Sequence, residues 1–255
     1  MKNSFVFQNR AVAFLDILGF TALTKDAEKN KTRFDDLSTL LHIIDSHVKY
    51  DNVNLASSVP DEIKPRYIFI SDSIIISSPL EFNEYNGLSI IILKAIQIAH
   101  KLLEIGCLLR GGISIGTVWH DNSNIIGTGY IDAFNAEKNA NYPRIILTKE
   151  AENYYNNSLL GGNNLSSYEL CVKYYDEKMI VDTLHPLYSR NSQVGITYED
   201  TFSQYRSYIL NNLQNKIAGS SERSKWEWMA TFFNRAISQH QVIVMPFTEF
   251  PFPPN

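Results

Sequence analysis

The chain has 255 residues, of which 44% are hydrophobic and 20% are charged, and this composition is typical of a globular protein with a sizeable buried core. The 23 basic and 27 acidic side chains give a net charge of −4, so no overall basic field favours binding to nucleic acid or to an anionic membrane. The two cysteines form no CxxC or Cys/His pattern, and the first ten residues lack an apolar signal core. We therefore expect a cytoplasmic protein with no membrane partner and no nucleic-acid partner.

The first half of the chain predicts alternating strands and helices. Residues 10–20, RAVAFLDILGF, have the apolar run of a buried strand, and residues 32–50 place apolar side chains on one helical face. Two β-branched runs at 66–77, RYIFISDSIIIS, are joined through a Ser-Asp-Ser turn and predict a hairpin. An amphipathic helix is predicted from about Leu88 to Ile105, and residues 107–120 predict a further strand.

The resulting order of elements predicts the fold class. A β-α-β-β-α-β order is typical of an α+β fold with a ferredoxin-like βαββαβ core, also called the palm arrangement, here over about residues 8–150. A C-terminal addition follows at about 168–248, and it consists of a second hairpin and two helices. These three elements are predicted at residues 169–184, 198–217 and 221–238. No repeat or low-complexity linker divides the chain, so we expect a single domain over residues 1–255.

The motif FLDILGFTAL at residues 14–23 places a carboxylate in the middle of the first strand. An unpaired buried carboxylate costs several kcal/mol, so Asp16 needs a helix N-terminus, a cation or a metal beside it. In the predicted fold, Asp72 of the hairpin turn lies near the end of that strand, and the two carboxylates face one point. Such a pair suits Mg²⁺ or Mn²⁺, because hard cations prefer oxygen ligands. The alternatives are an N-cap role for Asp16 and an ordinary turn role for Asp72.

The segment after Asp16 suits phosphate binding. Gly19 permits a tight turn, and the backbone N–H groups of Phe20 and Thr21 at a helix start can donate to phosphate oxygens. Strand alternation places Phe14 on the face of Asp16, where it would touch a ribose or a base; packing in the core is its alternative role.

In this order, FLDILGFTAL, ISDSI on a hairpin and LLRGGISIGTV resemble the catalytic domain of class III nucleotidyl cyclases over roughly the first 145 residues. The resemblance implies a head-to-tail homodimer with active sites at the interface, in which a nucleoside triphosphate is closed to a 3′,5′-cyclic monophosphate. It also implies two metal ions, Mg²⁺ or Mn²⁺, bound by Asp16, Asp72 and the carbonyl group of Ile17. The segment from Gly19 to Thr21 would surround the phosphates.

Two features depart from the purine-specific members of this family. Position 68 is Ile where a polar base-reading residue is expected, and residues 127–145 lack the family's Asn-x-x-x-Arg pair. The pattern GYIDAFNAEKNANYPRI and the late KWEWMATFFNRAI are similar to the pyrimidine cyclases of the Pycsar antiphage system, and this similarity extends over nearly the whole chain. It implies that UTP or CTP becomes cyclic UMP or cyclic CMP, a second messenger that activates a separate effector chain.

Several polar residues are candidates for the remaining contacts. Arg110, Lys138 and Arg144 are candidates for the missing phosphate cation, and we place Arg144 in the predicted catalytic set with the two aspartates. Each of the three is also a common surface or structural residue. Tyr67 precedes the second metal carboxylate on the hairpin and is a candidate for the base pocket, with core packing as its alternative role.

Three functions remain open from the sequence. The first is a pyrimidine nucleotide cyclase, and the second is an ATP or GTP cyclase with an unfamiliar base pocket. The third is a degenerate cyclase-homology domain that binds nucleotide without chemistry. The presence of both metal aspartates favours an enzyme, and Ile68 disfavours a purine base.

Overall fold

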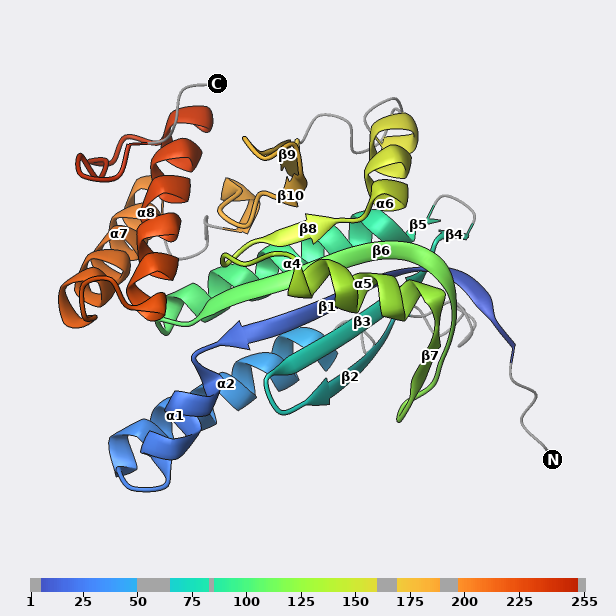
Figure 1. Cartoon of the computed structure of the whole chain (residues 1–255), viewed down its shortest axis with the longest axis horizontal. Helices are drawn as coiled ribbons and strands as arrows, with labels where there is room; N and C mark the ends of the chain where they lie inside the picture. The colour runs from blue at the N-terminus through green and yellow to red at the C-terminus, as the bar shows by residue number, and fades with distance from the viewer. Residues whose placement is uncertain (1–5, 50–64, 83–84, 160–168, 189–196, 252–255) are drawn as a thin grey trace.

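The computed structural model describes residues 6–49, 65–82, 85–159, 169–188 and 197–251. Figure 1 shows a twisted sheet with helices on both of its faces and two long helices at one end. The strands are β1 (Gln8–Leu18), β2 (Arg66–Ile70), β3 (Ser73–Pro79), β4 (Glu81–Phe82), β5 (Tyr85–Asn86), β6 (Leu108–His120), β7 (Ile125–Gly127), β8 (Ile145–Leu147), β9 (Cys171–Lys173) and β10 (Met179–Val181). The α-helices are α1 (Phe20–Ala27), α2 (Lys31–Lys49), α4 (Gly87–Glu104), α5 (Thr128–Lys138), α6 (Lys149–Tyr154), α7 (Tyr198–Asn215) and α8 (Ser221–Gln239).

The centre of the sheet has the predicted ferredoxin-like topology. The strand order is β2-β3-β1-β6, and each neighbouring pair in this group is antiparallel. Helix α2 follows β1 and helix α4 follows β3, which completes the βαββαβ order. Strand β8 then pairs parallel with β6, and the β9–β10 hairpin extends the same sheet beyond β8. The predicted α+β fold is confirmed, and the predicted second hairpin belongs to the main sheet.

The side chains of β1 alternate between two differently covered faces of the sheet, as the twofold period of a strand requires. Ala13, Leu15 and Ile17 are fully buried in the larger core, which includes apolar residues of α2 and α4. Val12 and Phe14 belong to a smaller cluster on the other face, where α5 covers the sheet. Figure 1 shows α5 in front of the sheet and α4 behind it. Asp16 continues the series of Val12 and Phe14, and its side chain therefore lies on the face of α5.

The two C-terminal helices are confirmed close to their predicted positions. Helices α7 and α8 contribute aromatic side chains to a second core, which also includes Leu108 of β6 and Ile146 of β8. A buried hydrogen bond also connects α4 to α7: one ring nitrogen of His100 in α4 lies 2.7 Å from the Tyr205 hydroxyl of α7. Among the described residues, no helix is long and apolar enough to cross a membrane.

His100 makes a testable contribution to the pH dependence of stability. Burial lowers the pKa of His100 to about 4, whereas the unfolded side chain titrates near pH 6.5. Between these values the unfolded chain binds more protons than the folded chain, so the free energy of unfolding falls as the pH drops from about 6.5 to 4, by roughly 3 kcal/mol for this residue. We expect His100→Gln to lower Tm at pH 7.5 but to flatten the fall of Tm in this interval. Thermal unfolding at pH 7.5, 6, 5 and 4 measures both effects.

The control for this experiment is Asn135→Gln, because the exposed Asn135 side chain on α5 has no titratable group. The control should reproduce the pH profile of the wild-type protein. Parallel Tm profiles for His100→Gln and the wild-type protein would contradict the assignment.

Candidate active site

The two predicted metal carboxylates lie at the same end of the sheet. Asp16 is in register with Ser73 of β3 and with Arg110 of β6. Ser71 and Asp72 form the two-residue turn between β2 and β3, and the backbone carbonyl of Asp72 accepts a hydrogen bond of 2.9 Å from the N–H of Ile17. Burial raises the pKa of the Asp16 carboxyl most strongly, and the negative charge of Asp72 raises it further against the opposing charge of Arg110. The structure therefore brings the two carboxyl groups within electrostatic reach of each other.

A single arginine side chain joins Asp16 to a third carboxylate. The Nη2 atom of Arg110 lies 2.9 Å from Oδ2 of Asp16 and 2.6 Å from Oε1 of Glu137. The Glu137 side chain is only 6% exposed, and burial raises its pKa. Arg110 was one of three candidate cations in the sequence, whereas Glu137 was not identified. The single positive charge of the guanidinium group is thus shared by two carboxylates that approach from different elements, β1 and α5.

Gly112 allows the close approach of α5 that places Glu137 beside Arg110. A Cβ atom at Gly112 would lie 2.2 Å from the carbonyl oxygen of Ala133 and 2.6 Å from the backbone nitrogen of Glu137. Both atoms belong to the backbone of α5, so the helix itself would have to move. We expect Gly112→Ala to lower the free energy of unfolding by roughly 1–3 kcal/mol, as overpacking usually does.

Chemical denaturation of Gly112→Ala measures this loss, and Asn135→Ala on the exposed side of α5 is the control. Because α5 also positions Glu137, we expect this loss in Gly112→Ala alone. Unchanged stability of this variant would contradict the rigid contact between α5 and β6.

The β1–α1 turn has the backbone geometry expected for phosphate binding. Gly19 has φ = 90°, a left-handed conformation that favours glycine, and α1 begins directly after it at Phe20. The first N–H groups of a helix have no acceptor within the helix and can donate to an anion. The Phe20 side chain packs against the larger core while Thr21 is exposed, so the backbone of the first turn faces outward near Asp16.

The residues present fit a hard divalent cation. The charge of Asp72 acts on the Asp16 carboxyl, and the raised pKa of Asp16 indicates that a further positive charge there would stabilise the ionised carboxyl. Among the described residues, no group of three or more His, Cys, Asp or Glu side chains could hold a metal by itself. This agrees with Mg²⁺ sites that use one or two carboxylates and complete their coordination with substrate phosphates and water. The Ile17 side chain is buried, so only its backbone could contribute a ligand.

Three predicted site residues have packing roles in the structure. Phe14 is 7% exposed, and its ring centroid lies 5.1 Å from that of Phe134 in α5. Tyr67 packs against the larger core on the face opposite Asp16, because neighbouring residues of β2 point to opposite faces. Arg144 is 3% exposed, and its Nη2 atom donates to Oδ2 of Asp176 at 2.7 Å. These contacts are structural, and the predicted substrate contacts of Phe14 and Tyr67 and the predicted catalytic role of Arg144 stay predictions.

Lys138, the remaining candidate cation of the sequence, is exposed on α5, where its ammonium group lies 4.1 Å from the centre of the Phe134 ring. This contact is a cation–π interaction with a residue that packs against Phe14. Arg110 is therefore the candidate cation that directly contacts Asp16.

A scan of protein-family models finds no match to the chain, and a search of curated proteins finds none. Among solved structures, the chain is similar to the guanylyl cyclase domain of the RhoGC fusion protein from the aquatic fungus Blastocladiella emersonii, with 14% identity, a TM-score of 0.48, and 69% of this chain and 95% of that chain covered. It is also similar to the adenylyl cyclase CyaB from P. aeruginosa, with 15% identity, a TM-score of 0.45, and 69% and 93% covered. A third similar structure is the guanylate cyclase domain of RhGC from Catenaria anguillulae in complex with GTP, with 15% identity, a TM-score of 0.44, and 68% and 93% covered.

Proposed function

We propose that the protein is a nucleotide cyclase, which converts a nucleoside triphosphate to its 3′,5′-cyclic monophosphate and pyrophosphate. The observation that supports this most strongly is the position of Asp16 and Asp72 directly beside the left-handed turn at Gly19. Carboxylates for a cation and helix N–H groups for phosphate are adjacent there. A triphosphate with its divalent cation is the ligand that needs both.

The reaction requires four changes of bonding and charge. The ribose 3′ oxygen attacks the α-phosphorus and loses its proton to a solvent water molecule, the bond from the α-phosphorus to the α,β-bridging oxygen breaks, and pyrophosphate leaves with the electron pair. Mg²⁺ or Mn²⁺ held by Asp16, Asp72 and the Ile17 carbonyl would lower the pKa of the 3′ hydroxyl and neutralise phosphate charge. The N–H groups at the start of α1 would orient the phosphate oxygens. Arg110 orients the Asp16 carboxylate and is close enough to this point to donate to a phosphate oxygen.

For the base, we propose a pyrimidine, supplied as UTP or CTP. Support comes from Ile68, which packs in the cluster of Phe14 and Ile75 and offers no hydrogen-bonding group for a purine edge. The sequence similarity of residues 129–145 and 225–237 to pyrimidine cyclases of antiphage systems supports the same substrate class. A second-messenger role with a separate effector chain is part of this proposal.

For assembly, we propose a homodimer with the active sites at its interface. Ile70, two residues before Asp72, is 60% exposed, and Ile131 of α5 is 52% exposed, so apolar side chains are exposed on the hairpin and on α5. A second copy of the chain would cover this surface. Size-exclusion chromatography with light scattering measures the assembly, and a fully active monomer would exclude shared sites.

One observation favours a second candidate, a nucleotide-binding domain without chemistry. The Asp16 carboxylate is already paired with Arg110 at 2.9 Å, and a permanent ion pair would compete with metal binding. In that case the protein would bind a nucleoside triphosphate and release it unchanged.

The experiment that separates these functions uses the full chain with Mn²⁺ and each of ATP, GTP, CTP and UTP in separate reactions. Products are identified by mass, and EDTA reactions are the control. A cyclic pyrimidine monophosphate supports the whole proposal, whereas a cyclic purine monophosphate supports the cyclase and refutes the base assignment. Nucleotide binding without any product, in a folded dimer, favours the binding domain.

A further inference from the structure

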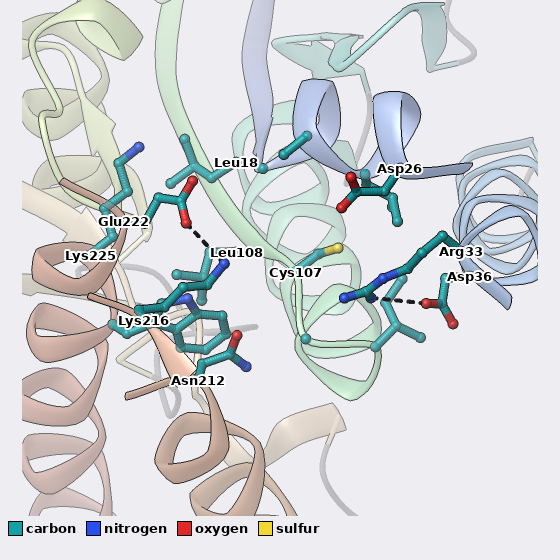
Figure 2. A pocket seen from close by; sticks show the side chains of 16 residues that line it. Leu18, Asp26, Arg33, Asp36, Cys107, Leu108, Asn212, Lys216, Glu222 and Lys225 are labelled. Atoms are coloured by element: carbon teal, nitrogen blue, oxygen red, sulfur yellow. Dashed lines mark hydrogen bonds and ion pairs between the residues drawn. The ribbon is translucent and has the colours of Figure 1, made fainter. Parts of the chain in front are cut away.

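A cavity of about 190 Å³ lies beside the β1–α1 turn, the segment proposed to bind phosphate. Leu18 and Gly19 of the β1–α1 turn line one part of it, and the ends of α7 and α8 line another. Figure 2 shows Leu18 and Lys225 on the same side of this cavity, with Cys107 near its centre. A group bound at Gly19 would therefore have direct access to the cavity.

Most of the charged groups around the cavity neutralise one another. Arg33 pairs with Asp36 at 3.1 Å, and Lys216 pairs with Glu222 at 2.9 Å. Lys225, near the start of α8, differs from these groups. It is half-buried, and its ammonium group forms no hydrogen bond or ion pair within the described part of the chain. An ammonium group in this position has three unused donors and a net positive charge to offer a ligand.

The charge of Lys225 acts on the candidate metal site. Burial raises the pKa of the Asp16 carboxyl, while the positive charges of Arg110 and Lys225 act in the opposite direction. Asp26 lies on the opposite side of the cavity from Lys225 (Figure 2). The positive end of the cavity is therefore the end that Lys225 lines, and an anion that extends past Gly19 into the cavity would be attracted toward Lys225.

We propose that Lys225 binds the β- and γ-phosphates of the nucleoside triphosphate and holds the pyrophosphate as it leaves. This inference rests on the proposed cyclase function, with the α-phosphate beside Asp16 and the terminal phosphates in the cavity. Negative charge grows on the α,β-bridging oxygen as its bond to the α-phosphorus breaks, and a fixed ammonium group stabilises that charge. The C-terminal addition thereby contributes a substrate-binding residue to the site on the ferredoxin-like core.

Steady-state kinetics of Lys225→Met and Lys225→Arg test this role. Methionine retains the apolar stem of lysine and removes its charge. We expect Lys225→Met to raise KM for the nucleotide and the inhibition constant of pyrophosphate together, each by roughly 10- to 100-fold, and to lower kcat. Lys225→Arg should recover most of both losses, which a packing role of the lysine stem would not predict. The control is Lys149→Met, since Lys149 is an exposed lysine of α6 that pairs with Glu152.

Calorimetric binding of pyrophosphate in the presence of Mn²⁺ tests the same role without turnover. Binding by the wild-type protein that weakens in Lys225→Met and not in Lys149→Met supports the inference, even if no nucleotide is cyclised and the proposed function fails. Turnover by the wild-type protein, with unchanged KM and unchanged pyrophosphate inhibition in a folded Lys225→Met, overturns the inference and leaves the cyclase proposal intact. Absence of pyrophosphate binding to the wild-type protein also overturns it.

Discussion

Asp16→Asn and Asp72→Asn should each lower the rate of cyclic nucleotide formation by about 1,000-fold or more while the protein stays folded. Each replacement keeps the shape of the side chain and removes a carboxylate that would bind the divalent cation. A bound cation contributes several kcal/mol of charge stabilisation, and each 1.36 kcal/mol corresponds to a factor of ten in rate. Product formation with Mn²⁺ at saturating nucleotide measures the effect.

The control for these variants is Asp35→Asn, which removes one exposed carboxylate of α2 and should retain full activity. More than a tenth of the wild-type rate in either Asp16→Asn or Asp72→Asn would refute the two-carboxylate site.

Asp16→Asn should also change the thermal stability of the metal-free protein. The pKa of Asp16 is raised in the folded protein, mainly by burial, so the ionised carboxyl destabilises the metal-free fold as the pH rises through that pKa. Asp16→Asn should therefore have a Tm equal to or above that of the wild-type protein at pH 7.5 in EDTA. The difference should shrink toward pH 4, and Mn²⁺ should raise Tm of the wild-type protein only.

Arg110→Met should have the second large effect, a loss of both stability and activity. The Arg110 guanidinium is the shared partner of Asp16 and Glu137, whose side chains are 18% and 6% exposed. Its removal leaves two like charges close together without a counter-ion. Breaking a buried pair in this way typically costs 3–5 kcal/mol, and the partial exposure here favours the lower end, so we expect a Tm lower by roughly 6–12 °C at pH 7.5. Thermal unfolding at pH 7.5 and pH 5 should show a smaller loss at pH 5, where the carboxyls are closer to their raised pKa values.

A double-variant cycle separates the two roles of Arg110. Arg110→Met with Glu137→Gln removes one of the two uncompensated charges and should recover part of the lost stability, while turnover should stay low. Arg110→Lys keeps a positive charge but lacks the forked guanidinium group that contacts both carboxylates. Its stability should lie between that of the wild-type protein and that of Arg110→Met. Equal stability of Arg110→Met and the wild-type protein would contradict the bridging role.

The central fold was predictable because its signals are local. A buried strand with Asp16, a hairpin with Asp72 in its turn, and an amphipathic helix between Leu88 and Ile105 each follow from periodicity over a few residues. Their order alone then fixes the ferredoxin-like sheet, since consecutive elements tend to be neighbours.

The remaining parts of the site depend on contacts between residues that are distant in sequence. Helix α5 buries only Gly129, Ala133 and Glu137, so its apolar periodicity is weak and the helix was not predicted. Lys225 lines the same cavity as Gly19 because α7 and α8 pack against the end of the sheet, and no local pattern indicates that placement. In the sequence Arg144 is a candidate phosphate cation, because nothing local indicates that it forms an ion pair with Asp176, 32 positions later.

The central position of β1 in the sheet also affects how the protein folds while the ribosome synthesises it. This strand has 11 residues, and its partners β3 and β6 follow it in the chain and begin only at Ser73 and Leu108. At about 5–20 residues per second, synthesis of β6 follows that of β1 by roughly 5–20 s. Until β3 has emerged both edges of β1 are open, and until β6 has emerged one edge stays open, a condition that favours aggregation and chaperone binding. Nascent chains that stop before His120 should therefore remain unfolded, and the sheet should close only after β6 has left the exit tunnel.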